Sequence, residues 1–181
     1  LGGYEQLKII MLADKIKQLK LTNLAKFGVK ITPGNFLDYF FKYSSSLGGR
    51  GKQRAIDFLA SINNLPKAYT NITSVFDGKE QTDILINNDH KNPEKYIAPY
   101  FHGRNIIEKI LNFETKVLLP ENMLMKSDRM TMAFGVEARV PLLDYRLVEL
   151  AHNMPSDLKI NLLQNKIALR KTMNNYLPKE V

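Results

Sequence analysis

Two short strings, KSDRM (residues 126–130) and GVEARVPLLD (residues 135–144), are the most informative part of this sequence. Both place charged side chains among Met, Ala, Val and Leu. The charged residues of this region are Lys126, Asp128, Arg129, Glu137, Arg139, Asp144 and Arg146. Charges flanked so closely by apolar residues either pair at a junction between helices or face a ligand. Spacing alone leaves both interpretations open, and it favours structural ion pairing.

Outward from these strings, apolar residues repeat with the period of an α-helix, and no run alternates long enough to predict a strand. Helices are predicted over residues 4–19, a segment after Pro33-Gly34, residues 55–62, 96–101, 106–117, 120–134, 141–150 and 164–176. Proline is expected to start the helices at positions 120 and 141. Residues 135–140 are predicted to form a tight, site-forming connection. The Met residues at 123, 125, 130 and 132 are predicted to fill the core.

Composition narrows the function classes. The chain has 181 residues, 44% of them hydrophobic and 24% charged, which suits one soluble globular domain. The absence of cysteine excludes disulfides, thiolate metal sites and a cysteine nucleophile within these residues. No apolar window is long enough to span a membrane, so we expect a cytoplasmic protein without a membrane partner. Because both ends look cut, we expect a piece of a longer protein.

The net charge of +8 raises the question of an anionic partner. The basic residues are scattered, which predicts solvated helix faces rather than a nucleic-acid site. The segment of residues 44–52, SSSLGGRGK, differs from a phosphate loop, because Ser46 and Gln53 stand where that loop needs Gly and Ser or Thr. The three histidines lack the spacing of metal ligands, and no metal site is predicted.

Several motifs resemble one known family. They are LP (119–120), KxDRxxMA (126–133), VEARVPLLD (136–144), LKI (158–160), KxxLR (166–170), LP (177–178) and the opening LGGY (1–4). Together they resemble the C-terminal part of the synthetase domain of glutamine-dependent asparagine synthetases, with VEARVPLLD the most specific string. The opening is similar to the end of that family's Gly-Ala-Asp-Glu-Leu/Phe-Phe-Gly-Gly-Tyr segment. The strong motifs cover residues 119–181.

The resemblance implies a fold and a reaction. The family's synthetase domain is an α/β fold of the ATP-pyrophosphatase (adenine nucleotide α-hydrolase-like) type, and residues 1–181 would be one partial domain, its mostly α-helical C-terminal portion. The implied enzyme is a carbon–nitrogen ligase of asparagine biosynthesis. It would join aspartate to ATP as β-aspartyl-AMP, with release of pyrophosphate, and then to ammonia, with release of AMP. Magnesium would bind through the phosphates. The nitrogen would come from ammonia, or from glutamine through a separate or missing amidotransferase domain.

The resemblance also assigns residues. The implied catalytic residues are Lys126, Asp128, Arg129 and Glu137, and the implied substrate or nucleotide contacts are Gly2, Gly3, Tyr4, Arg139, Asp144 and Lys166. The cations on 126 and 129 would neutralise phosphate or the substrate carboxylate. The acidic residues of the set would orient those cations or contact the amino group of aspartate. Arg139 is expected mainly to hold a helix junction by pairing, and Lys166 is the weaker site candidate.

Departures from the family pattern keep alternatives open. The Ser-Gly-Gly-x-Asp-Ser pyrophosphate loop and the glutaminase domain are absent from these residues, so the chain by itself is predicted to be inactive. A related amide-forming ligase, such as a β-lactam synthetase or a peptide cyclase, is one alternative. A non-catalytic helical binding module is another, and a nucleic-acid-binding domain would show salt-dependent binding. The oligomeric state is open, with a homodimer as one alternative.

Overall fold

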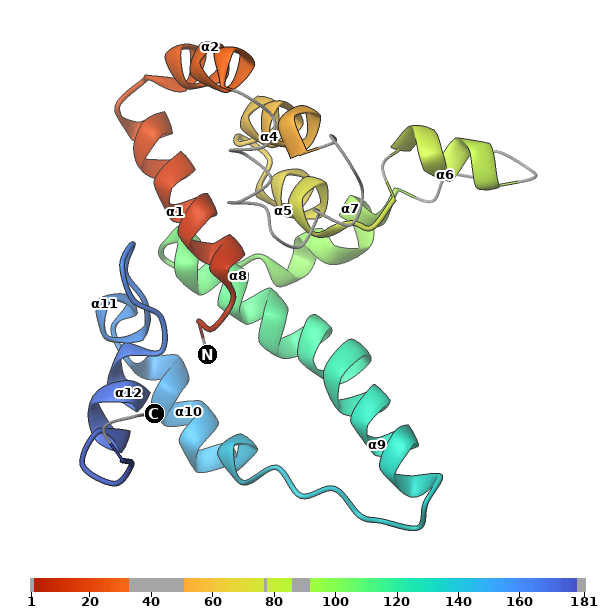
Figure 1. Ribbon diagram of the computed structural model, residues 1–181, viewed down its shortest axis with the longest axis vertical. Coiled ribbons are helices and arrows are strands. Elements are labelled where there is room, and N and C mark those ends of the chain that lie inside the picture. Colours follow the sequence, from red (N-terminus) through yellow and green to blue (C-terminus); the bar gives the residue numbers. More distant parts are fainter. Residues whose placement is uncertain (1, 33–50, 77, 86–91, 179–181) are drawn as a thin grey trace. The chain divides into compact units, whose positions relative to one another are not determined.

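The computed structural model describes residues 2–32, 51–76, 78–85 and 92–178, and these are mostly helical (Figure 1). The α-helices are α1 (Glu5–Gln18), α2 (Thr22–Ile31), α4 (Gly51–Ala60), α5 (Leu65–Thr73), α6 (Gly78–Ile84), α7 (Pro93–Ile97), α8 (Ile106–Phe113), α9 (Met125–Met132), α10 (Tyr145–Asn153), α11 (Ser156–Lys159) and α12 (Ile167–Met173). A π-helical segment, η3 (Glu114–Leu124), joins α8 to α9, and short 3-10 turns cover Ala98–Tyr100 and Pro141–Leu143. Within the described ranges no strand forms, and the one isolated bridge joins Ile160 to Asn165. The mostly helical class is therefore confirmed, and the α/β fold of a larger domain stays a prediction.

The chain divides into two compact units. We call Leu12–Pro99 the insert unit, and Leu1–Met11 together with Tyr100–Val181 the C-terminal unit. The boundary falls within α1. None of the described helices is long and apolar enough to cross a membrane.

The insert unit is built on the packing of α4 against α5, with α2 also against α4. Phe58 and Leu59 of α4 are buried, as are Ala68 and Tyr69 of α5. The start of α5 is fixed by the side chain of Asn64, which accepts a hydrogen bond from the Lys67 N–H. The sequence predicted α4 but missed α2, α5 and α6, because their apolar periods are short. The predicted helix after Pro33-Gly34 and residues 44–50 lie outside the described residues.

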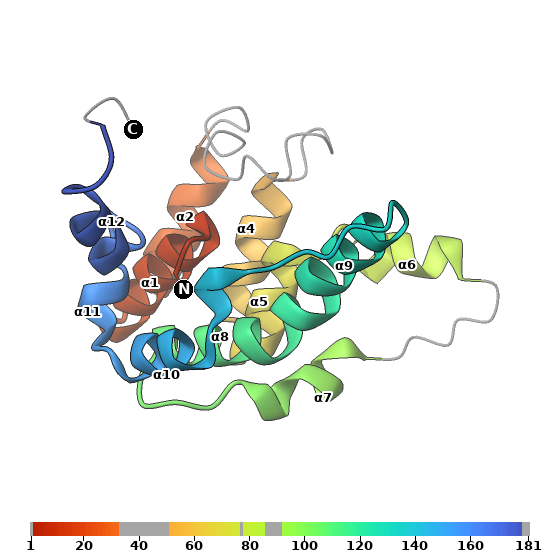
Figure 2. The ribbon, with the colours of Figure 1, turned by 90° about the horizontal axis from the view of Figure 1, so that it is seen from below.

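In the C-terminal unit one continuous helical rod runs from α8 through η3 into α9 (Figures 1 and 2). Asn105 caps its start by accepting from the Glu108 N–H at 2.9 Å, and Ile107, Ile110 and Leu111 are buried. The prediction that Pro120 starts a helix is wrong, because Pro120 lies inside η3. Proline lacks the N–H that an α-helix needs there. The rod winds as a π-helix around it, and the Met125 N–H donates to the Pro120 carbonyl five residues back.

Glycine at position 135 ends the rod. Gly135 has a φ of +68°, its N–H donates to the Met132 carbonyl, and the Val136 N–H donates to the Thr131 carbonyl, both at 3.0 Å. These two bonds form a Schellman motif, which favours glycine at the left-handed position. Residues 136–140 then run on without regular structure, and all except Ala138 are exposed. The predicted tight connection is therefore wrong, since the chain extends after the cap instead of folding back.

The core prediction for the four methionines is also wrong. Met123, Met125, Met130 and Met132 are 41%, 42%, 66% and 56% exposed. No side chain of α9 is buried by the described residues. Side-chain type alone does not bury a residue, because burial needs a partner surface.

The last part of the C-terminal unit consists of three short helices. Pro141 starts only a 3-10 turn, and α10 begins four residues later, where Asp144 accepts from the Arg146 N–H at 2.9 Å. The predicted helix from 141 is therefore wrong at its start. The predicted helix over 164–176 shortens to α12, and α11, which packs against α12, was not predicted.

Candidate functional site

The N-terminal segment of the C-terminal unit lies against the loop that carries Lys166. The side chain of Asn165 donates through Nδ2 to the Gly3 carbonyl at 3.3 Å. A Cβ added to Gly3 would lie 2.6 Å from Cε and 3.4 Å from Nζ of Lys166. Gly2 has a φ of +70°, and a Cβ there would lie 3.5 Å from Cβ of Ile160. The backbone angle of Gly2 favours glycine, and the absence of a Cβ on Gly3 leaves room for the end of the Lys166 side chain, which would have to shift if a Cβ were added.

The backbone of Lys166 adopts an uncommon conformation. Its φ and ψ are +51° and +38°, in the left-handed region, and it stands immediately before α12. Such a conformation in a residue other than glycine costs about 1–2 kcal/mol. The surrounding loop holds it. Ile160 bridges Asn165, and the Asn161 side chain accepts from the Leu163 and Gln164 N–H groups at 2.9 and 2.7 Å. Strain held in this way is a recurrent feature of functional positions.

We call Gly2, Gly3 and Lys166 the glycine–lysine site. Gly3 and Lys166, two predicted contacts far apart in sequence, lie side by side, and Gly2 precedes Gly3 against Ile160. Tyr4 follows directly, and its carbonyl accepts from the Leu7 N–H as α1 begins. The bond from Asn165 to Gly3 was not predicted, because the sequence shows only that Asn165 precedes Lys166.

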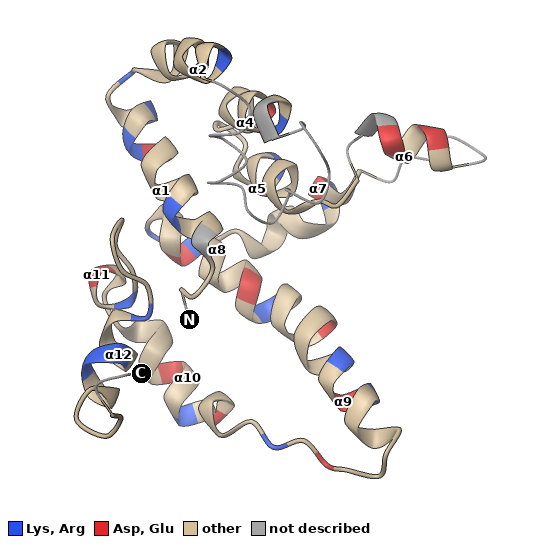
Figure 3. Cartoon of the chain, in the orientation of Figure 1, with Lys and Arg blue, Asp and Glu red and all other residues tan. Residues whose placement is uncertain are grey.

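The predicted residues of the KSDRM string lie along α9. Lys126, Asp128 and Arg129 are all exposed, and Figure 3 shows charges of both signs along α9. Within the described part of the chain, none of their side chains forms an ion pair or hydrogen bond. Asp128 helps to line a pocket of about 350 Å³ with Ala138 and Val140. The structure therefore brings Asp128 to the GVEARVPLLD string, while Lys126 and Arg129 do not line this pocket.

The charged residues of the GVEARVPLLD string pair locally. Arg139 Nη2 lies 2.8 Å from Glu137 Oε1, and both side chains are exposed. The pair lies within the irregular connection, so the expectation that Arg139 holds a helix junction is wrong. The residues are too close in sequence to join two elements, and an exposed pair contributes below about 1 kcal/mol.

Asp144 has a structural role in addition to its predicted contact role. Its carboxylate caps α10 and pairs with Arg146, whose Nη2 lies 2.9 Å from Oδ2. The hydrogen bond from the Arg146 side chain, followed by the one from its backbone N–H, lowers the pKa of Asp144 below its ordinary value. Within the charged region, the ion-pairing interpretation therefore describes Glu137, Arg139, Asp144 and Arg146. It does not describe the cations of α9.

The structure separates the predicted residues into two groups. We call Lys126, Asp128, Arg129, Glu137 and Arg139 the α9 group. Figures 1 and 2 both show α9 and α12 on opposite sides of the C-terminal unit, joined through the 136–144 segment and α10.

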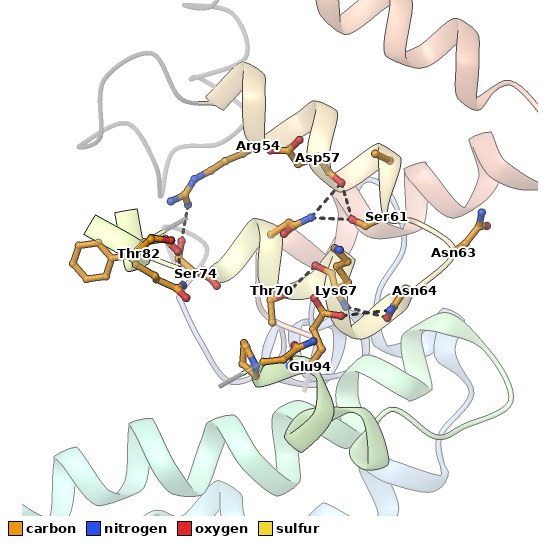
Figure 4. Close-up of a pocket in the computed structure, with 16 residues that line it drawn as sticks. Arg54, Asp57, Ser61, Asn63, Asn64, Lys67, Thr70, Ser74, Thr82 and Glu94 are labelled. Atoms are coloured by element: carbon orange, nitrogen blue, oxygen red, sulfur yellow. Dashed lines mark hydrogen bonds between the residues drawn. The ribbon is translucent and has the colours of Figure 1, made fainter. Parts of the chain in front are cut away.

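A second pocket, which the sequence analysis missed, lies in the insert unit (Figure 4). It has a volume of about 870 Å³, and its lining residues come from α4, α5, α6 and the start of α7. The nearly buried guanidinium of Arg54 donates to the carbonyls of Ser74 and Val75 at 2.6 and 2.7 Å. The Asn71 amide donates to the Ser61 hydroxyl at 2.9 Å. These wall side chains bond to protein atoms, and no nucleophile–base pair is among them.

No cluster of three His, Cys, Asp or Glu side chains that could hold a metal ion occurs among the residues the structure describes. A lysine beside a glycine segment is instead suited to an anion, because the ammonium supplies charge and the glycines leave space next to it.

The chain is similar to known proteins of one family. A family model described as asparagine synthase matches residues 13–181. The chain is 40% identical over 60 residues to asparagine synthetase [glutamine-hydrolyzing] 3 of Bacillus subtilis, an alignment that covers 33% of this chain and 10% of that protein. For asparagine synthetase [glutamine-hydrolyzing] 1 of the same organism the identity is 33% over 75 residues, covering 41% and 12%. Asparagine synthetase [glutamine-hydrolyzing] 2 is 46% identical over 50 residues, covering 28% and 7%. The matches thus span about a tenth of the length of these relatives, and no solved structure matches.

Proposed function

This chain belongs to the asparagine synthase family, and from that premise we propose that it takes part in the ATP-dependent amidation of aspartate to asparagine. The observation that supports this most is the contact of Gly3 with Lys166. Two motifs of the resemblance, at opposite ends of the sequence, form one local arrangement that suits a phosphate.

The proposed reaction has two steps. In the first, an oxygen of the aspartate side-chain carboxylate bonds to the α-phosphorus of ATP, and the bond to pyrophosphate breaks. In the second, the nitrogen of ammonia attacks the acyl carbon of β-aspartyl-AMP, AMP leaves with the carbon–oxygen electron pair, and a proton is released. Ammonia would be supplied directly or from glutamine.

The glycine–lysine site would act in the first step. Negative charge builds on phosphate oxygens as pyrophosphate leaves, and a fixed cation stabilises that charge more than it stabilises the ground state. The Lys166 ammonium would supply this charge, and the Gly2-Gly3 segment would let phosphate oxygens approach the backbone. Magnesium would be held by the phosphates, in keeping with its preference for phosphate oxygens and water, because the described residues offer no carboxylate cluster for it.

The α9 group would be a second contact region. Lys126 and Arg129 carry charge that no described side chain neutralises, and Asp128 lines the small pocket. We propose that these two cations bind phosphate or the aspartate carboxylate, and that Asp128 and Glu137 orient them or the aspartate amino group. We also propose that the 181-residue chain alone does not turn over, since it contains no Ser-Gly-Gly-x-Asp-Ser loop.

The test is pyrophosphate release by the full-length protein with ATP, magnesium, ammonia and aspartate, against a reaction without aspartate. We expect aspartate-dependent release together with asparagine. Lys166→Ala should reduce it to a small residual rate, while Lys171→Ala, which deletes an exposed cation on the following helix α12, should not. Release that depends on another carboxylic acid would indicate a related amide-forming ligase, such as a β-lactam synthetase. No release from a folded, nucleotide-binding protein would indicate a non-catalytic helical binding module.

A further inference from the structure

Lys159, a residue outside both groups, is buried. It ends α11 and is only 5% exposed, although lysine is rarely buried without a partner. Its ammonium donates to the His152 carbonyl at 2.9 Å. His152 lies in the last turn of α10. The bond therefore joins two helices of the C-terminal unit through a side chain that no part of the proposed chemistry uses.

The end of α10 explains why a lysine stands there. The last carbonyls of a helix have no partner within the helix, and the helix dipole places partial negative charge on them. A cation near them is favourable on both counts. Burial lowers the pKa of Lys159, and the nearby Glu108 carboxylate opposes that shift. The nearby Arg104 guanidinium adds to the lowering of the Lys159 pKa, and the bond to the His152 carbonyl holds the ammonium in place.

The backbone of Lys159 leads directly into the glycine–lysine site. Its carbonyl oxygen lies 3.7 Å, and Ile160 Cβ lies 3.5 Å, from the place where a Cβ on Gly2 would stand. Ile160, itself almost fully buried, forms an isolated antiparallel β-bridge with Asn165. The next residue is Lys166. The loop over residues 160–165 is therefore fixed at its first residue, at its closing bridge and against the N-terminal segment.

From this chain of contacts we propose that Lys159 is a positioning residue for Lys166. By bonding to the end of α10, its ammonium fixes the start of the 160–165 loop, so that the loop holds the Lys166 ammonium beside Gly3. Lys159 touches no substrate in this proposal and acts only through Lys166. The kinetic part of the inference rests on the proposed function, but the structural part does not.

The kinetic test uses Lys159→Met in the full-length protein, because methionine keeps most of the stem and removes the donor. A displacement of about 1 Å can cost up to about 100-fold in rate, so we expect kcat for pyrophosphate release to fall roughly 10–100-fold. The KM for aspartate should change little. Lys159→Arg, which keeps a charged donor, should recover most of the rate, and Lys171→Met should behave as wild type.

A double-variant cycle separates positioning from general stability. If Lys159 acts through Lys166, Lys159→Met should lower the residual rate of the Lys166→Ala protein less than twofold. An equal loss in both backgrounds would overturn the proposal.

Hydrogen exchange provides a readout that does not need activity. Lys159→Met should speed amide exchange in peptides covering residues 2–4 and 160–166, and leave residues 106–113 of α8 unchanged. Unchanged exchange at 160–166 would overturn the proposal even if the protein is an active synthetase. Faster exchange there in a protein without synthetase activity would support the positioning contact and count only against the proposed function. If Lys159→Met does not fold, Lys159→Gln, which retains a neutral donor, is measured in the same way and judged by the same outcomes.

Discussion

Replacing Gly3 by alanine tests the glycine–lysine site with the smallest change the chain allows. The added Cβ would lie 2.6 Å from Cε of Lys166. Since carbon atoms in good contact stand about 3.5–4.0 Å apart, Cε must move by about 1 Å. The atom displaced is near the end of a flexible side chain, so the fold can absorb the change at a cost below about 1 kcal/mol. A functional ammonium cannot move that far without consequence, because misplacement by about 1 Å can cost up to about 100-fold in rate.

We therefore expect Gly3→Ala to lower kcat for pyrophosphate release by roughly 10–100-fold while the thermal midpoint stays within a few degrees of wild type. Gly28→Ala is the matched control, because Gly28 lies inside α2 with nothing within 4 Å of an added Cβ. It should keep full activity and gain roughly 0.5–1 kcal/mol of stability. A Gly3→Ala protein with wild-type kcat would refute the argument, since the ammonium would then not need its observed place.

Three further predictions concern other parts of the C-terminal unit. Lys166→Gly should relieve the left-handed strain and raise stability by about 1 kcal/mol in a thermal melt while abolishing pyrophosphate release; a clear loss of stability would show that the lysine stem packs more than it strains. Asp144→Ala should lower the melting temperature by removing the cap of α10. Because the Arg146 hydrogen bond lowers the folded pKa of Asp144, its contribution should be complete above the ordinary value of 3.8 and disappear as pH falls through the lower folded pKa, so melts of the two proteins should converge in acid and not in base. Arg129→Ala and Glu137→Gln, both at exposed positions, should leave stability within about 0.5 kcal/mol and abolish pyrophosphate release; unfolding instead would favour a structural role.

Local signals predicted those helices whose ends are decided within a few residues. The helix predicted over 96–101 forms earlier, as α7 from Pro93 to Ile97, with Asn92 as its capping side chain. Pro120 carries the same signal and misleads, because the π-helical winding of η3 lets the chain continue through it. A proline indicates a helix start only if the residues before it leave the helix, and the residues before Pro120 stay helical from α8 into η3.

The glycine–lysine site was predictable only in part, because its contacts join residues that are far apart in the sequence. The resemblance named Gly3 and Lys166, but no periodicity links positions so far apart, and only the folded loop shows that they touch. The contribution of Asn165 and Lys159 depends on which carbonyls their side chains reach. Asn165 bonds to the carbonyl of Gly3, which is 162 positions away in the sequence, and Lys159 bonds to that of His152, which is 7 positions away. Tertiary hydrogen bonds of this kind leave no pattern in a single sequence.

The geometry of α10 limits how the two groups can share the proposed reaction. Nine residues make a helix about 13 Å long, with Asp144 capping one end and Lys159 bonded at the other. An ion pair acts over about 4 Å, so we expect the α9 group and the glycine–lysine site to bind different groups of the substrates. One should contact phosphate and the other aspartate, or both should contact distant parts of ATP. Variants in the two groups should therefore separate in their KM values for ATP and for aspartate. If Lys166 and Arg129 variants instead changed the same KM by the same factor, the two groups would have to approach each other during the reaction, and α10 would be the element that moves.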